Sequence, residues 1–426
     1  MAAPEALKKE VGSAIDAMRA ELLALSHAIH GEPELALEEY KSAARLESAV
    51  ESFDIPVQKG AFSLETAYVS EFGKDGGPTI AILSEYDALP GVGHACGHNI
   101  IATAGLGAAM ALAKLGAKLP GRVRYLGTPA EERLGGKELM AREGAFDGTD
   151  AAMMIHPSNV DLITMPCIAI SEVEVTYHGR AAHASAMPYR GLNALDAVVT
   201  AYQSIAQLRQ HIKGTDRIHG IITDGGLAAN IVPERASCRF YVRAADVHEL
   251  SVLKKRVQAC FEAGALSTGC RAEIKWGNAD YLDMKTNWPM ADMFKQNAQA
   301  LGREFTPLES LPPGYAGSTD MGNISHRVPS IHPMLAVAPI GVIIHNAEFA
   351  RWAASERGDQ AVIDGAKALA FTALDLMADP ASLRAARMDF AATEELSKSA
   401  LAKSLEGVSH GHSHGHNHGH GGGCCA

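Results

Sequence analysis

The sequence predicts an α/β protein in which a catalytic domain, with a largely parallel sheet flanked by helices, is interrupted by an inserted α+β domain. Over residues 1–168, short apolar runs alternate with helical patterns, which indicates β-α-β units and a parallel sheet. Near residue 169 the pattern changes to alternating apolar and polar residues, as in strands with one exposed face. After residue 285 the helical, apolar pattern of the first part returns, so the middle segment is predicted to be an insertion.

The elements of the catalytic domain are predicted from helical periodicity and from short apolar runs. Each apolar run ends in residues that could carry chemistry, as expected where a buried parallel strand delivers side chains at its carboxyl end. The predicted helices cover residues 5–30, 40–53 and 100–117. The predicted strands lie in the segments PTIAILSEYDALP, GRVRYLGTPAEE and DAAMMIHP.

Residues 169–284 are predicted to form the inserted domain, with a four-stranded antiparallel sheet. The order of elements is strand, helix, strand, strand, helix, strand. The predicted strands are AISEVEVTYHG, GIITDGG, ASCRFYVRA and AEIKW, and the predicted helices cover residues 191–212 and 247–265. The catalytic domain is accordingly assigned to residues 1–168 and 285–400.

Composition limits the class of protein. A formal net charge of -11 argues against nucleic acid as a partner. The first residues lack the basic segment and apolar run of a signal peptide, and no apolar stretch reaches the roughly 18 residues that a membrane span needs. Seven scattered cysteines do not resemble a disulfide framework. We therefore expect a cytoplasmic protein that has no membrane partner.

Residues 401–426 are expected to form a disordered, His-rich tail, because VSHGHSHGHNHGHGGGCCA is too simple in composition to bury a core. The alternating histidines suit a natural metal-collecting tail, and an expression tag is the alternative. The tail also raises a different class of function, a metal-handling protein without catalysis.

The strongest candidate for chemistry is the segment GHACGHN, in which Cys96 and His98 lie two residues apart after a predicted strand. Thiolate and imidazole are both ligands of zinc and similar ions, and Gly97 lets the backbone bend so that both side chains can converge. A structural cysteine beside a helix-capping histidine would give the same local pattern. These two residues therefore do not define a metal site by themselves.

Further candidate ligands follow other apolar runs. Glu131 and Glu132 are adjacent at the end of one run, so one carboxylate could bind an ion while the other handles a proton of the attacking water. His156 and His345 each follow another apolar run. Solvated loop acids and buried core histidines are the alternatives for each residue taken alone. Their shared position at strand ends favours one joint metal site.

Together these segments resemble the metallopeptidase and amidohydrolase family of aminoacylase, carnosinase and glutamate carboxypeptidase. The motifs are SEYDALPGVGHACGHN, TPAEE, MMIHP, GRAAHASAMPYRGLNALDA, NIVPE, GSTDMG and HNAEF, in order from about residue 20 to residue 375. The chain is most similar to the branch with p-aminobenzoyl-glutamate hydrolase, the indole-acetyl-amino-acid hydrolases and the β-alanyl-lysine dipeptidase-like proteins.

The resemblance implies one or two divalent metal ions (Zn, Mn or Co). It implies that Cys96 bridges the ions, that Glu131 is the general base, and that Asp87 orients the site. The other implied ligands are His98, Glu132, His156 and His345. Two departures from the family pattern leave the number of ions open: Glu85 stands where distant members have a histidine ligand, and Asn99 where many relatives have an aspartate.

For the inserted domain, the resemblance implies a lid and dimerisation role. His183 would stabilise an oxyanion, and in dimeric relatives the equivalent histidine reaches the partner's active site. Asn230 and Arg243 would contact substrate, with Arg243 clamping a carboxylate. In the catalytic domain, Ser318, Thr319 and Asp320 form a polar loop flanked by glycines that would also contact substrate. A surface histidine, a surface arginine and ordinary turn chemistry are the alternatives.

The expected activity is metal-dependent hydrolysis of a C–N bond, with Glu131 moving the proton of water to the leaving nitrogen. The substrate would be a small molecule bearing a carboxylate: an N-acyl amino acid, a dipeptide or an aryl-amide carboxylate. Hydrolytic deamination of an aromatic amino-carboxylate would use the same site, and the motifs do not separate an acyl carbon from an aryl carbon. We expect a homodimer or a higher homo-oligomer.

Overall fold

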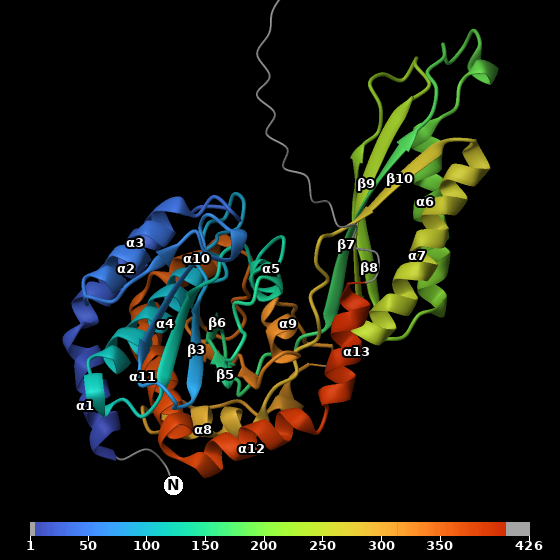
Figure 1. The fold of residues 1–426 in the computed structure, drawn as a ribbon. Coiled ribbons are helices and arrows are strands. Elements are labelled where there is room, and N and C mark those ends of the chain that lie inside the picture. Colours follow the sequence, from blue (N-terminus) through green and yellow to red (C-terminus); the bar gives the residue numbers. More distant parts are fainter. Residues whose placement is uncertain (1–4, 313, 406–426) are drawn as a thin grey trace, which may run out of the picture.

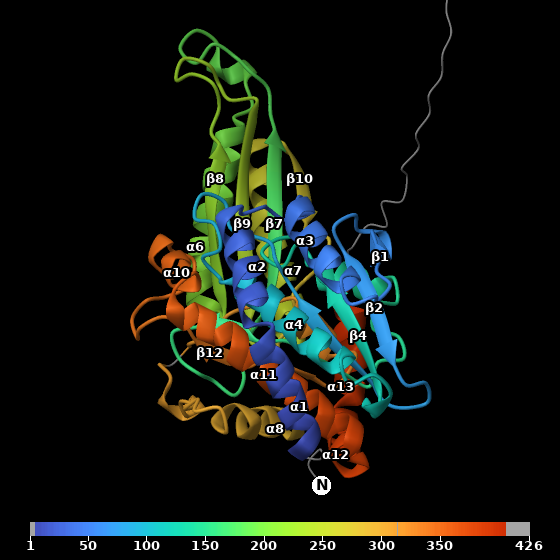
Figure 2. The same ribbon diagram turned by 90° about the vertical axis from the view of Figure 1, so that its left-hand side faces the viewer.

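Two sheets organise the chain, one in each of the two units that Figure 1 shows. The computed structural model describes residues 5–312 and 314–405. The catalytic unit is a six-stranded sheet between layers of helices, and the inserted unit is a slender four-stranded sheet with two long helices (Figures 1 and 2). The predicted α/β fold class, with its second, antiparallel sheet, is confirmed.

The catalytic sheet is parallel in its centre and antiparallel at one edge. Its strands are β1 (Gln58–Lys59), β2 (Tyr68–Gly73), β3 (Thr79–Ser84), β4 (Arg122–Gly127), β5 (Ala151–Met153) and β11 (Ser330–Ile331). Their order is β1-β2-β4-β3-β5-β11, and β3, β4, β5 and β11 run parallel. The antiparallel strands β1 and β2 were not predicted, because β1 has only two residues and β2 is partly buried and lacks a continuous apolar run.

Helices cover both faces of this sheet. They are α1 (Glu5–Ala17), α2 (Arg19–Gly31), α3 (Tyr40–Glu51), α4 (His98–Ala113), α5 (Gly136–Arg142), α8 (Trp288–Gln299), α9 (Met321–Ser325), α10 (Ala347–Ala353), α11 (Glu356–Ala378) and α12 (Pro380–Ala391). The single helix predicted over residues 5–30 is two helices, because the chain turns at Met18. The helix predicted from residue 100 begins at His98, which makes a candidate ligand its first residue.

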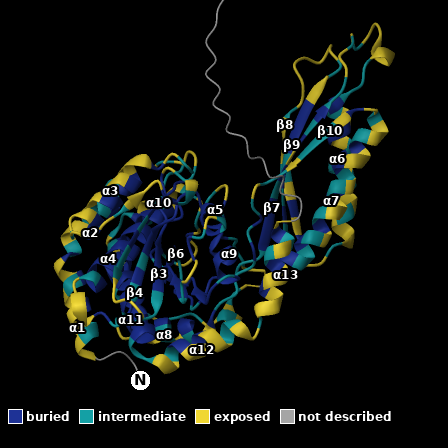
Figure 3. Ribbon diagram, viewed as in Figure 1, coloured by how far each residue is buried: buried dark blue, intermediate teal, exposed yellow. Residues whose placement is uncertain are grey.

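The sequence of β3 explains the layered packing. Ile80 and Ile82 lie in the core that contains α4 and α11, whereas Ala81 and Leu83 lie in the core that contains α5 and α9. Side chains of a strand alternate between its faces, so a strand covered on both sides needs an uninterrupted apolar run. Figure 3 shows the resulting buried interior beneath an exposed outer layer.

The inserted unit follows the predicted order of elements. They are β7 (Ala169–His178), α6 (Ala194–Leu208), β8 (Arg217–Asp224), β9 (Arg235–Ala244), α7 (Val247–Thr268) and β10 (Arg271–Trp276). The strands pair antiparallel in the order β10-β7-β9-β8. Val173, Phe240 and Phe261 belong to the core between this sheet and its two helices. The opposite face of the sheet is free of these helices.

The C-terminal helix α13 (Glu394–Ser404) returns to the inserted unit, where Ala400 packs with Val247 and Leu282. Leu401 to Ser404 are therefore helical, and the disordered tail predicted from residue 401 begins too early. The His-rich segment itself, residues 406–426, lies outside the described residues. Among the described helices, none combines the length and the apolar character needed to cross a membrane.

Candidate metal centre

The candidate ligands meet at the carboxyl ends of the catalytic strands, the edge at which open α/β sheets bind ligands. They come from the loop after β3 (Asp87, Cys96), the start of α4 (His98), the loop after β4 (Glu131, Glu132), the start of a short strand β6 (His156–Ser158) and the loop before α10 (His345). Strand β6 pairs in parallel with β12 (Met334–Ala336). A segment that precedes the inserted unit in sequence therefore lies beside a segment that follows it. Segments from both halves of the catalytic unit thus build one site.

The backbone at this edge is bent in ways that only a few residue types favour. Gly97 has a φ of 76°, and a Cβ there would lie 2.8 Å from Cγ of Pro157. Glycine is therefore required between Cys96 and His98. Ala130 and His345 also have positive φ angles, of 62° and 67°. Such strained residues tend to cluster at functional sites.

The ligand atoms form two groups that share one cysteine. Donor atoms of Cys96, His98 and His156 all lie within 4.8 Å of one another, and so do those of Cys96, Glu132 and His345. A third group consists of His98, Glu131 and Glu132. Cys96 is thus the candidate ligand that would contact both ions if two were bound.

Asp87 orients two of these groups. Its Oδ1 lies 3.1 Å from Nδ1 of His98, and its Oδ2 accepts a hydrogen bond of 2.9 Å from the backbone N–H of Glu132. With Nδ1 engaged, Nε2 of His98 faces the site. A carboxylate that fixes the ring of a ligating histidine in this way is typical of metal centres.

A fully buried ion network lies against the ligands. The Nζ of Lys137 is 2.5 Å from Oε2 of Glu85 and 2.7 Å from Oδ1 of Asp320. Oε1 of Glu85 is 3.3 Å from Nε2 of His98. Because Lys137 lies on α5 and Asp320 directly precedes α9, the network ties the two halves of the catalytic unit together. Glu85 stood out in the sequence as a departure from the family pattern, but no local signal indicated its contact with Lys137.

Burial and neighbouring carboxylates disfavour the negatively charged forms of the acidic groups in this site. Burial, together with the carboxylates of Glu85 and Glu132, raises the pKa of Glu131 well above its usual value. Burial raises the pKa of Glu132 to about 7, and burial also raises that of the Cys96 thiol. Bound cations would compensate this excess and favour the ionised ligands.

The donor set fits divalent metal ions. Nε2 of His98 and Oε1 of Glu85 and of Glu132 are buried and make no hydrogen bond within the described residues. Buried polar atoms without partners are uncommon in proteins and call for an explanation such as a ligand. Sulfur, imidazole nitrogen and carboxylate oxygen together suit zinc and similar ions. Bound divalent ions would satisfy the His98 and Glu132 atoms, which belong to candidate ligands.

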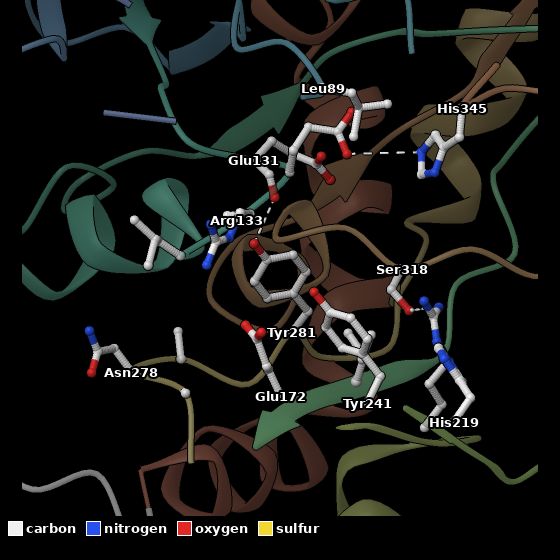
Figure 4. Close-up of a pocket in the computed structure, with 16 residues that line it drawn as sticks. Leu89, Glu131, Arg133, Glu172, His219, Tyr241, Asn278, Tyr281, Ser318 and His345 are labelled. Atoms are coloured by element: carbon white, nitrogen blue, oxygen red, sulfur yellow. Dashed lines mark hydrogen bonds and ion pairs between the residues drawn. The ribbon is translucent and has the colours of Figure 1, made fainter. Parts of the chain in front are cut away.

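A cavity of about 310 Å³ connects the metal centre to the inserted unit (Figure 4). Glu131, Glu132 and His345 line one side, and Arg243 lies on the opposite side with Ser318. The guanidinium of Arg243 donates a hydrogen bond of 3.1 Å to the Ser318 hydroxyl, and no described acidic residue forms an ion pair with it. This half-buried cation can bind a carboxylate group.

Three predicted substrate or oxyanion contacts lie outside this cavity. Thr319 is 1% exposed, and its hydroxyl accepts a hydrogen bond from the backbone of Met321, so in this conformation it stabilises a turn. His183 and Asn230 are exposed, beyond the end of β7 that is distant from the cavity. Strand β7 reaches the cavity at Ile170 and ends eight residues later, a rise of about 26 Å. One chain therefore does not bring His183 to its own metal centre.

Several residues near the site were not recognised from the sequence. Lys137 carries the buried ion network, and Glu172, Tyr241 and Tyr281 line the cavity. Asp320 was expected to contact substrate, but it is fully buried and pairs with Lys137. The alternation in AISEVEVTYHG predicted an exposed face for that strand, but it did not indicate that this face lies towards the candidate metal centre.

Comparison with known proteins supports this description. Residues 81–372 match peptidase family M20/M25/M40. Xaa-Arg dipeptidase of Mus musculus is 40% identical over 400 residues, which cover 91% of this chain and 92% of that protein. A p-aminobenzoyl-glutamate hydrolase subunit from Escherichia coli (strain K12) is 28% identical over 446 residues, covering 88% of this chain and 92% of the relative.

Solved structures show the same fold. An aminobenzoyl-glutamate utilization protein from Klebsiella pneumoniae superposes with a TM-score of 0.68 and 19% identity, over 84% of this chain and 96% of that one. A Bacillus subtilis protein described as a dinuclear metal binding peptidase superposes with a TM-score of 0.62 and 20% identity, over 85% and 99% of the two chains.

The fold and the site together define a metal-dependent hydrolase that acts on C–N bonds. The candidate ligands are of the types that metal-dependent hydrolases use. Relatives that span most of the chain are named as a dipeptidase, an aminobenzoyl-glutamate hydrolase and a deacetylase. The chain belongs to peptidase family M20/M25/M40. The predicted family and the predicted amide-bond hydrolysis are confirmed.

Proposed function

We propose that this protein is a two-ion dipeptidase that cleaves the amide bond before a C-terminal residue bearing a free carboxylate. The observation that carries the proposal is the sharing of Cys96 between two groups of ligands beside Glu131. In this assignment one ion is held by Cys96, His98 and His156, and the other by Cys96, Glu132 and His345. Zinc, manganese and cobalt are the candidate ions.

The ions would polarise the scissile carbonyl and lower the pKa of a water molecule. Glu131 belongs to neither of the groups that contain Cys96, so its carboxylate is available to take a proton from the attacking water. The same carboxyl then returns the proton to the leaving nitrogen. Asp87 keeps the ring of His98 in one orientation. Arg243 and Ser318 hold the substrate carboxylate.

The names of two relatives indicate which C-terminal residue the dipeptide substrate could carry. The Mus musculus and Homo sapiens proteins, 40% and 39% identical to this chain, are both named Xaa-Arg dipeptidase. A dipeptide with a basic C-terminal residue is therefore our first candidate. Hydrolytic deamination of an aromatic amino-carboxylate is the second candidate, because the same base and ions would serve. No described feature of the cavity favours an aryl over an acyl carbon.

We propose that the active unit is a homodimer in which His183 of one protomer completes the active site of the other. Three observations support this. His183 lies far from the metal centre of its own chain. The outer edge of β8 has no strand beside it among the described residues. Large apolar side chains are also exposed near this edge and the tip: Met187, Tyr189, Ile221, Ile222, Leu227 and Ile231. An exposed apolar edge strand favours pairing with a second copy.

Turnover of Ala-Lys, N-acetyl-lysine and 4-aminobenzoate by protein of measured metal content tests the reaction. We expect amide cleavage with two ions per chain. Ammonia release from the aminobenzoate without amide cleavage would identify a deaminase instead.

Mixing two inactive variants tests the shared site. Glu131→Gln and His183→Ala homodimers should each be nearly inactive, whereas subunit exchange creates heterodimers with one complete site. About a quarter of wild-type activity should return at equal mixing. No recovery after exchange, shown by mass spectrometry of the mixed dimers, would exclude a contribution of His183 across the dimer.

A further inference from the structure

Opposite charges on neighbouring strands of the cavity wall support an inference that rests on the proposed function. In the antiparallel pairing of β7 and β9, Ile170 lies opposite Arg243 and Glu172 lies opposite Tyr241. Paired residues, and residues two apart along a strand, point to the same face of a sheet. Glu172 and Arg243 therefore project from one face, and both line the cavity beside the metal centre.

The carboxylate of Glu172 is only partly engaged by the protein. It accepts no hydrogen bond from any described side chain, and its one ion pair joins Oε1 to Nε of Arg239 at 3.2 Å. Arg239 is held more closely by Glu174, whose Oε1 accepts a hydrogen bond of 2.9 Å from the same Nε and a second one from Nη2. Oε2 of Glu172 thus remains available to a ligand.

The spacing of the two charges suits a single basic residue. Diagonal neighbours on adjacent strands lie about 7–8 Å apart, and their Cβ atoms are somewhat closer. A lysine carries its ammonium on a four-carbon stem, and arginine has a similar reach. When Arg243 holds the α-carboxylate of such a residue, its cationic head can extend along the strand to Glu172.

The surroundings of Glu172 also favour a cation. Tyr241, which pairs with Glu172 across the two strands, and Tyr281 line the cavity beside Glu172 (Figure 4). Aromatic faces attract cations as well as covering an aliphatic stem. Arg133 is a competing positive charge in the same cavity, but it directly follows Glu132 on the catalytic side. Glu172 is the one acidic residue that the inserted unit contributes to the described lining.

We propose that Glu172 is the specificity-determining residue that selects a lysine or arginine at the C-terminal position of the substrate. It acts on binding of the side chain and not on the proton transfers of hydrolysis.

The ratio of kcat/KM for Ala-Lys to that for Ala-norleucine tests this proposal, because norleucine has the same stem without the ammonium. A hydrogen-bonded ion pair in a partly buried site predicts a preference of about ten- to 100-fold in the metal-loaded, full-length protein. Glu172→Gln should abolish this preference. Glu172→Lys should instead favour Ala-Glu over Ala-Lys.

Glu273→Gln is the matched control, since Glu273 on β10 pairs with Thr176 and so lies on the same face of the sheet as Glu172, outside the cavity lining. Its described partners are Lys275 and His178, so Arg239 keeps its contact with Glu174, and the Ala-Lys to Ala-norleucine ratio should stay within about threefold of wild type. An unchanged ratio in Glu172→Gln, or an equal loss in Glu273→Gln, would overturn the role of Glu172.

Binding of free L-lysine and L-norleucine, measured by calorimetry on the metal-loaded protein, separates this inference from the proposed function. If no dipeptide is hydrolysed, the proposed function fails. Glu172 is still supported when wild type binds L-lysine more tightly than L-norleucine and Glu172→Gln does not. If wild type binds both amino acids equally, the inference fails whatever the reaction is.

Discussion

Replacing each of the two adjacent glutamates by glutamine should have different consequences, although the two positions are neighbours in the chain. Glu131→Gln should reduce kcat by about 100- to 10,000-fold, the usual contribution of a general base, and leave the metal content unchanged. At about 1.4 kcal/mol per tenfold change, this corresponds to about 3–5 kcal/mol in the barrier. Glu132→Gln removes a ligand from the group with Cys96 and His345, so it should reduce the metal content from two ions to one.

The structure explains why these effects should separate. The hydroxyl of Tyr281 donates a hydrogen bond of 2.6 Å to the backbone carbonyl of Glu131, and Asp87 accepts one from the backbone N–H of Glu132. These contacts position the backbone whichever side chain is present. Glutamine also has nearly the same volume as glutamate, so neither change opens a cavity.

Metal content by mass spectrometry and single-turnover kinetics on the same samples would measure the two effects. Each variant serves as the control for the other. Loss of an ion in Glu131→Gln would show that Glu131 is a ligand, as its group with His98 and Glu132 also permits. Retained turnover in Glu131→Gln would show that another group takes the proton.

Three further changes test the physical basis of the site. Lys137→Met leaves the buried carboxylates of Glu85 and Asp320 without their cation. It should lower the free energy of unfolding of the metal-free protein, measured with urea, by about 3–5 kcal/mol. A loss under about 1 kcal/mol would contradict this account. Burial raises the pKa of Glu39 from 4.5 to about 7, so the folded state binds more protons and stability should fall by about 3 kcal/mol as pH rises through this range. Urea denaturation at pH 5 and pH 8 should show that the free energy of unfolding falls less between these pH values in Glu39→Gln than in wild type. An equal fall in both proteins would refute this explanation. Zinc at 100 times its Kd should stabilise the fold by about 3 kcal/mol, and no rise in Tm would argue against binding to the folded state.

The residues that meet at the candidate metal centre could be predicted because each stands beside a local signal. Cys96 and His98 flank a glycine after an apolar run, and Glu131 and Glu132 follow another apolar run. Parallel strands of one sheet end at a common edge, so residues that follow such runs meet in space even when they are far apart in sequence. The order of elements in the inserted domain was readable for the same reason, because periodicity of side chains is a local property.

What the sequence by itself determined, then, is the fold class, the family and the residues at the strand ends. Only the tertiary structure decided which partners they meet. Lys137 is isolated in sequence from Glu85 and Asp320, and no local pattern marks their contact. The sequence indicates only that Glu172 is an exposed strand residue. Its place in the cavity lining depends on the positions of β9 and of the catalytic unit. His183 is within a recognisable motif, yet the length of β7 keeps it from its own active site. These are long-range relations set by packing, which the spacing of residues along the chain does not encode.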